Sequence, residues 1–128
     1  MNTNLISPKI HGLNDYLLST VLLAAPPLLG FDKQSQRVYK GFSLNLLGYN
    51  AFSDHPLAIK RMIPTEEHYR MDYANLVGLT VATFQEPVRR NKKVLLFHLG
   101  ILALSAINVL LTDLSLIHIS EPTRLLRS

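Results

Sequence analysis

Four stretches of this chain contain no Asp, Glu, Lys or Arg, and three of them are apolar around nearly their whole helical circumference. The stretches are residues 16–31, 41–53, 73–85 and 94–112, of which 41–53 is the exception. A helix that lacks a polar face must be surrounded by other protein or by lipid. A chain of 128 residues with four helices, three of them of this kind, has no residues left for an outer protein layer. We therefore expect an all-α, four-helix transmembrane bundle whose surroundings are the lipid bilayer.

Length alone does not decide between membrane helices and soluble helices. Only 94–112 reaches the roughly 18 residues usual for a spanning helix, whereas 41–53 and 73–85 are short enough for the core of a soluble bundle. The short stretches span a bilayer only if the flanking Tyr and charged side chains lie at the interface and the bilayer thins locally. Pro26 and Pro27 predict an end or a kink in the first helix, and Pro87 predicts the end of the third.

The two halves of the chain resemble each other. An offset of 57 residues pairs His11 with His68, Asp15 with Asp72 and Tyr16 with Tyr73, and an offset of 59 pairs Ser53 with Thr112 and Asp54 with Asp113. Each half then reads as a His-x-x-x-Asp-Tyr segment, an apolar run, a basic loop and a second apolar run. We expect one membrane domain, residues 1–113, made of two parallel helical-hairpin repeats at about 6–55 and about 63–113.

The repeated His and Asp residues form a candidate polar or ion site. A His and an Asp four residues apart lie on one face of a helix. The expected topology places both pairs on the same side of the membrane as the last Asp of each repeat. The six residues are His11, Asp15, Asp54, His68, Asp72 and Asp113. In one interpretation each pair is a hydrogen bond that fixes helix packing. In the other, the pairs form a shared proton or metal site.

No other chemistry is indicated by the residues. The chain has no cysteine, no phosphate-binding glycine loop and no nucleophile motif, and the His-x-x-x-Asp spacing differs from the common metal-binding motifs of helices. We expect a protein that is not an enzyme and that has no metal, no other cofactor and no nucleic-acid partner. His98, Ser105 and Asn108 interrupt the fourth apolar run and are expected to be intramembrane polar residues that face the bundle interior.

The basic residues predict an orientation. The loops after the first and third helices carry seven Lys and Arg, against four on the opposite side: Lys33, Arg37, Lys40, Arg89, Arg90, Lys92 and Lys93 against Lys9, Lys60, Arg61 and Arg70. Cytoplasmic loops of membrane proteins carry the excess of basic residues. We therefore expect a multi-pass protein of the cell inner membrane with both termini outside the cytoplasm.

Two segments resemble known sequences. SPKIHGLNDYLLSTVLLAAPPLLGF and SDHPLAIKRMIPTEEHYRMDY resemble small bacterial membrane proteins built from Ser-Pro-Trp repeats, and the resemblance covers residues 6–113. It implies a four-helix integral membrane protein without established chemistry. The chain departs from that pattern because Ala25, Pro26 and Pro27 stand where Ser-Pro-Trp is expected, and it contains no Trp. Residues 114–128, LSLIHISEPTRLLRS, resemble translated sequencing-adapter DNA and are expected to be a non-native tail; a native amphipathic tail is the alternative.

Three functions remain open at this point. The first is a membrane protein with a structural or accessory role, as a homo-oligomer or as a partner within a larger membrane complex. The second is a small transporter, or a proton or ion permeation protein, that uses the His-x-x-x-Asp pairs. The third is a soluble helical bundle with a His/Asp metal site. The distance between Asp15 and Asp72 is informative here, because close approach favours a site and wide separation favours two independent packing bonds.

Overall fold

The structure, a computed structural model, describes the backbone of residues 6–127 and the side chains of residues 6–112. Its helices are α1 (Pro8–Leu28), α2 (Lys33–Ala51), α3 (Thr65–Thr83), α4 (Glu86–Arg89) and α5 (Lys92–Arg127). Over this range the chain contains no β-strand, and an isolated bridge joins Ser53 to Ile63 in the long loop between α2 and α3. The all-α prediction is therefore confirmed, and the one-turn helix α4 is an element that the sequence pattern did not indicate.

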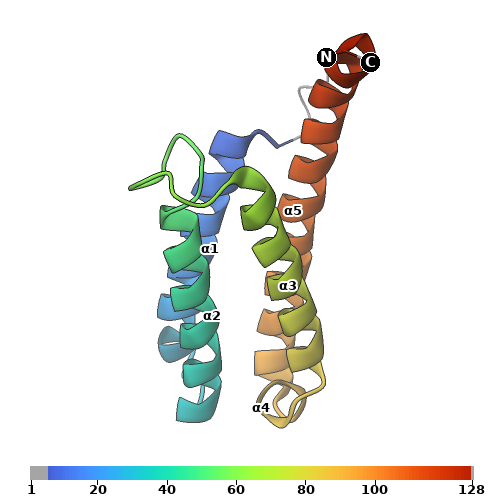
Figure 1. Cartoon of the computed structure of the whole chain (residues 1–128). Helices are drawn as coiled ribbons and strands as arrows, with labels where there is room; N and C mark the ends of the chain where they lie inside the picture. Colours follow the sequence, from blue (N-terminus) through green and yellow to red (C-terminus); the bar gives the residue numbers. More distant parts are fainter. Residues whose placement is uncertain (1–5, 128) are drawn as a thin grey trace.

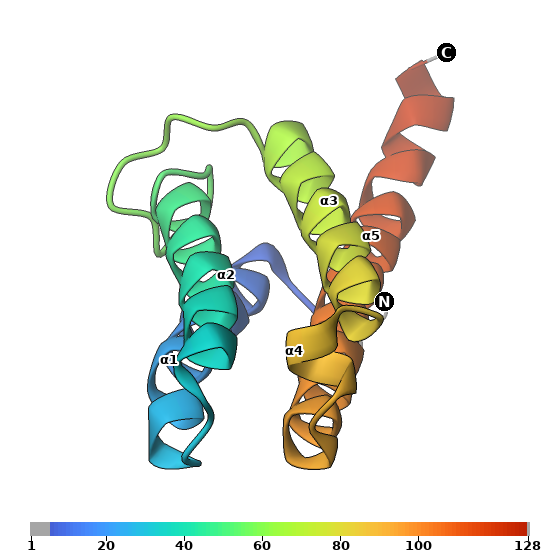
Figure 2. The same cartoon turned by 90° about the horizontal axis from the view of Figure 1, so that it is seen from below.

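The four long helices form two antiparallel hairpins that lie side by side (Figure 1). α1 packs mainly on α2 and α3 packs mainly on α5, while the contacts between the two hairpins are sparser (Figure 2). The start of α1, the loop at 52–64 and the end of α2 lie at one end of the bundle, which we call the loop end. The short turns at 29–32 and 84–91 lie at the opposite end, which we call the turn end.

The end of α1 differs from the expectation. Pro26 and Pro27 were expected to end or kink the helix, but α1 continues through both prolines to Leu28. Gly30 then adopts a positive φ of 74°. Its amide donates to the carbonyl of Pro27, and the amide of Phe31 donates to the carbonyl of Pro26. This is the glycine-based C-cap that satisfies the free carbonyls of a last helical turn, so the glycine ends the helix and the prolines are accommodated within its last turn.

Pro87 also has a different role from the predicted one. α3 already ends at Thr83, and Pro87 lies in the first turn of α4. A proline is tolerated there because an amide in the first turn of a helix has no partner within the helix. At the neighbouring turn, Asp32 caps α2 by accepting a hydrogen bond from the Ser35 amide at 2.7 Å. That hydrogen bond holds the pKa of the Asp32 carboxyl below its usual range.

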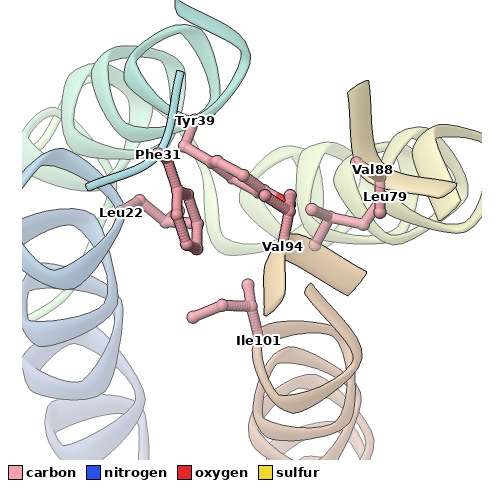
Figure 3. Packing of buried hydrophobic residues seen from close by; sticks show 7 residues of the cluster. All are labelled: Leu22, Phe31, Tyr39, Leu79, Val88, Val94 and Ile101. Atoms are coloured by element: carbon pink, nitrogen blue, oxygen red, sulfur yellow. The ribbon is translucent and has the colours of Figure 1, made fainter. Parts of the chain in front are cut away.

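The interior is more polar than the exterior. Among the described side chains, 14 polar or charged residues are buried against 12 buried hydrophobic ones, and 22 large hydrophobic side chains are exposed. The largest apolar cluster lies toward the turn end, where Phe31 and Tyr39 of one hairpin approach Val94 and Ile101 of the other (Figure 3). A soluble bundle buries its apolar stripe and exposes its polar one. This bundle departs from that distribution, because its interior holds as many polar as hydrophobic residues and large hydrophobic side chains are exposed on its surface.

One helical segment of the described residues is long and apolar enough to cross a membrane by composition alone. It is Lys92–Thr112 of α5, with a mean hydropathy of 2.4. α1, α2 and α3 contain 21, 19 and 19 residues. Their lengths approach what a bilayer requires, but their polar residues lower their mean hydropathy. The four long helices are therefore arranged as a bundle. Among the described residues, their composition identifies one candidate membrane span, Lys92–Thr112, and not four.

Candidate functional site

Two His and two Asp residues meet at the loop end of the bundle interior. His11 and Asp15 are one turn apart on α1, and His68 and Asp72 are one turn apart on α3. All four are between 2% and 4% exposed. Each residue directs one ligand-type atom to a common centre, and these four atoms lie within 4.8 Å of one another. The two pairs are therefore one cluster and not two separate packing bonds, and we call it the His/Asp centre.

The contacts within the centre are mutual. Nε2 of His11 lies 2.8 Å from Oδ2 of Asp72 and 3.1 Å from Oδ2 of Asp15. Nε2 of His68 lies 3.2 Å from Oδ2 of Asp72 and 3.3 Å from Oδ2 of Asp15. The two Nε2 atoms are 3.4 Å apart. Each imidazole thus contacts the carboxylate of its own helix and that of the other hairpin, so the centre joins α1 to α3.

Two hydroxyl groups fix which nitrogen of each imidazole carries a hydrogen. Nδ1 of His11 lies 2.8 Å from Oγ1 of Thr112, and Nδ1 of His68 lies 2.6 Å from Oγ of Ser53. Each hydroxyl already donates its own hydrogen to the carbonyl four residues earlier in the chain, that of Asn108 and of Tyr49 respectively. A hydroxyl has one hydrogen to donate. It must therefore accept from Nδ1–H, and this leaves Nε2 of both rings directed at the carboxylates.

Two further donors orient the carboxylates. The hydroxyl of Tyr49 donates to Oδ1 of Asp72 at 2.7 Å, and the amide of Asn108 donates to Oδ1 of Asp15 at 3.0 Å. In each Asp, Oδ1 is therefore occupied by a neutral donor and Oδ2 faces the centre. Helices α2 and α5 supply these donors, so every long helix contributes to the arrangement. In metal-binding sites, hydrogen bonds from neighbouring groups commonly orient the ligand side chains in this way.

The glycine next to His11 allows the loop to close over the centre. A Cβ at Gly12 would lie 2.6 Å from Nδ1 and 2.8 Å from Cε1 of His55. The His55 ring cannot easily move, because its Nε2 donates to the carbonyl of Asn50 at 2.7 Å and its Nδ1 accepts from the amide of Leu57 at 3.2 Å. The side chain of Asn50 in turn donates to the carbonyl of Gly12 at 3.0 Å. α1 and the 52–64 loop can therefore pack this closely only with glycine at this position.

We expect Gly12→Ala to destabilise the protein by about 1–3 kcal/mol, the usual cost of one extra carbon in a packed site that cannot adjust. Thermal unfolding followed by circular dichroism in detergent measures the effect. Gly41→Ala is the matched control, because Gly41 is also helical and a Cβ there meets nothing within 4 Å; it should be neutral or stabilising by about 0.5–1 kcal/mol. Equal melting temperatures for the two variants would contradict the close packing.

The other expected site residues have different positions. Asp54 lies outside the centre: it is exposed, and its carboxylate is 3.6 Å from the guanidinium of Arg61. The side chain of Asp113 lies outside the described residues. The residues that do face the centre are one position earlier: Ser53, just after the end of α2, and Thr112, within α5. Asp54 follows the end of α2 at Ala51, so its side chain leaves the bundle while that of Ser53 is still directed inward.

Of the three polar residues expected inside the fourth run, Asn108 belongs to the surroundings of the centre. His98 is fully buried near the turn end, where its Nε2 donates to the carbonyl of Leu79 at 2.7 Å and its Nδ1 accepts from the hydroxyl of Tyr39 at 2.8 Å. It is a packing residue with both nitrogens satisfied. Ser105 is buried, and its hydroxyl has no hydrogen-bond partner among the described residues.

Tyr49, Ser53 and Thr112 were not singled out as site residues from the sequence. The pairing of Ser53 with Thr112 at an offset of 59 was the available signal, and Tyr49 pairs with Asn108 at the same offset.

Comparison of the chain with protein-family models, with curated proteins and with solved structures finds no match.

Proposed function

We propose that this chain is an integral membrane protein, a bundle of two parallel hairpins with a structural role or a role as an accessory subunit of a membrane complex. The observation that carries the proposal is the outward surface. The exposed large hydrophobic side chains come from all four long helices, including Leu17, Leu44, Val77 and Leu104. An apolar surface that surrounds a bundle on all its helices far exceeds the single patches normal for soluble monomers, and lipid is its natural environment.

The distribution of charge supports the same proposal. Every Asp, Glu, Lys and Arg of residues 6–112 lies outside the four apolar runs, either near the loop end or near the turn end. The two carboxylates deepest along the helices, Asp15 and Asp72, are buried and face the interior. Ionisable residues of transmembrane helices face the bundle interior and pair with one another in this way.

The contacts also support two equivalent repeats. Thr112 binds His11 as Ser53 binds His68, and Asn108 binds Asp15 as Tyr49 binds Asp72. These are the partners related by offsets of 57 and 59 in the sequence. They are consistent with an approximate twofold axis along the bundle, and with the resemblance to Ser-Pro-Trp repeat membrane proteins, which we retain as a proposal.

Ion permeation has less support than a structural role. A permeation path needs polar groups or water along the length of the bundle. Between the His/Asp centre and the turn end, buried apolar side chains close the interior. They include Leu22, Leu79 and Ile101, which are 1%, 0% and 4% exposed. This buried apolar layer separates the centre from His98 at the turn end.

Site-specific labelling tests both the membrane location and the orientation. The chain has no cysteine, so single cysteines at Ile59 and Gln85 report the loop end and the turn end without altering the basic residues. In intact spheroplasts we expect a membrane-impermeant maleimide to label Ile59→Cys, and to label Gln85→Cys only after permeabilisation. Both variants should remain in the membrane fraction after an alkaline wash.

The unsubstituted chain gives the background for this experiment. Equal labelling of both variants, with recovery in the soluble fraction without detergent, would disprove the membrane location. The reversed pattern, with Gln85→Cys labelled from outside, would disprove only the orientation.

A further inference from the structure

We propose that the His/Asp centre binds one divalent transition-metal ion of the zinc class, with Nε2 of His11 and His68 and Oδ2 of Asp15 and Asp72 as its four ligands. The proposal goes beyond the structural role above and does not depend on the membrane location. It rests on the hydrogen-bond inventory of the centre, on the separations of its four inner atoms and on a path to them.

The hydrogen bonds around the centre use the outer atoms of its side chains and leave four inner atoms, the two Nε2 and the two Oδ2, facing one another. A positively charged group is expected between them. Thr112 and Ser53 hold the Nδ1–H of each ring, so in its neutral form each imidazole directs a lone pair from Nε2 to the centre. Oδ2 of each Asp also directs lone pairs there, because Oδ1 is the atom that accepts from Asn108 or Tyr49. Four converging acceptors require bridging protons or a cation. Two neutral imidazoles and two carboxylates carry a charge of −2, which one divalent ion neutralises.

The separations agree with a four-coordinate site. Zinc with nitrogen and oxygen ligands at about 2.0–2.1 Å in a tetrahedron has ligand atoms about 3.3 Å apart. The Nε2–Nε2 separation is 3.4 Å and the four Nε2–Oδ2 separations are 2.8, 3.1, 3.2 and 3.3 Å. All four atoms, the two carboxylate oxygens included, lie within 4.8 Å of one another. The hydrogen bonds to Nδ1 match the outer contacts that commonly orient zinc-bound His.

A narrow cavity leads to the centre from the loop end. It has a volume of about 10 Å³, and its lining includes His11 and His68 of the centre together with Ser53 and Tyr69. This is close to the smallest space that holds a water molecule. An ion that sheds its water fits a path of this size.

Four protein ligands leave no open coordination position, which is the arrangement of structural zinc sites and not of catalytic ones. The ion would connect α1 of the first hairpin to α3 of the second, where the contacts between the hairpins are otherwise sparse. The expected consequence is a bundle whose two halves are locked together by metal and loosen when it is removed.

Metal binding is tested on the full chain purified in detergent with a histidine-free tag and stripped with EDTA. We expect titration with ZnCl2, followed by calorimetry, to show one ion bound per chain and a raised melting temperature. Titration with CoCl2 should produce the intense visible absorption of tetrahedral Co²⁺. Failure of the wild-type chain to bind either ion would overturn the proposal and leave a proton-bridged centre.

Matched substitutions locate the ion. Asp72→Asn and His68→Gln should abolish binding, whereas Asp54→Asn makes the same chemical change as Asp72→Asn at the same end of the bundle and should retain it. Unchanged binding by Asp72→Asn, or equal losses by Asp72→Asn and Asp54→Asn, would overturn the assignment.

Ser53→Ala keeps all four ligands and removes only the acceptor for Nδ1–H of His68. We expect it to weaken zinc binding about 10–100-fold, the usual effect of losing an outer contact to a metal-bound His. Circular dichroism confirms that each variant is helical. If the ligand variants do not fold, Ser53→Ala decides the question, because wild-type affinity in this variant would contradict the proposed role of His68.

Discussion

An Asp72→Ala variant is expected to lose about 3–5 kcal/mol of its free energy of unfolding, the usual cost of removing one partner from a buried ion pair. Asp72 is 2% exposed, accepts a hydrogen bond from Tyr49 and has its Oδ2 2.8 and 3.2 Å from Nε2 of His11 and His68. Its removal leaves three buried polar groups without this partner. Chemical denaturation in detergent with EDTA present measures the loss, since the chelator removes any contribution from a bound ion.

Asp54→Ala is the control for this variant, because it removes the same side chain from the same end of the bundle. Asp54 is exposed, and its carboxylate lies 3.6 Å from Arg61. Exposed ion pairs contribute about 0–1 kcal/mol, so the control should differ little from the wild type. If the two substitutions have similar effects, the His/Asp centre does not stabilise the bundle.

The second large effect is expected at the outward apolar surface. Val77 lies near the middle of the apolar run of α3 and is 64% exposed. If this surface faces lipid, Val77→Arg should make membrane insertion less favourable by about 2.5–3.5 kcal/mol, as for a charge at the centre of a membrane helix. The fraction of chains integrated into membranes during translation in the presence of membrane vesicles measures this change.

Ile59→Arg is the matched control for Val77→Arg. Ile59 is 78% exposed but lies in the loop between α2 and α3, outside the apolar runs. The two sites are similarly exposed, so a water-soluble bundle would tolerate both arginines equally well. A membrane bundle should tolerate only Ile59→Arg. Equal insertion of the two variants would rule out lipid as the surroundings of α3.

Part of the arrangement of the candidate site could be predicted from the sequence. The repeated spacing in the two His-x-x-x-Asp segments indicated that each pair shares a helix face, and the hairpin topology indicated that both pairs lie at one end. The meeting of the pairs was not predictable, because it depends on how the two hairpins rotate about their own axes. Asp54 was favoured over Ser53 for its charge, although the two residues point in different directions at the end of α2.

The helix boundaries were also predictable from the sequence only in part. Each apolar run overlaps one of the helices α1, α2, α3 and α5, although α1, α2 and α3 each begin eight residues before their run. The continuation of α1 through Pro26 and Pro27 and the presence of α4 were not anticipated. Both depend on local capping, by Gly30 after α1 and by a proline in the first turn of α4, and proline alone does not distinguish the start of a helix from its end.

The sequence by itself determined that the chain is helical, that its charges gather at the two ends of the helices and that its two halves carry the same polar pairs. These properties follow from composition and spacing, which act over a few residues. Only the tertiary structure decided that the pairs join into a single centre and that hydroxyl groups of α5 and of the residues after α2 hold the imidazoles. The contacts of His11 with Thr112 and Asp72, and of His68 with Asp15, join residues 53–101 positions apart, whereas His68 and Ser53 are 15 apart. All of them depend on the packing angle and rotation of whole helices.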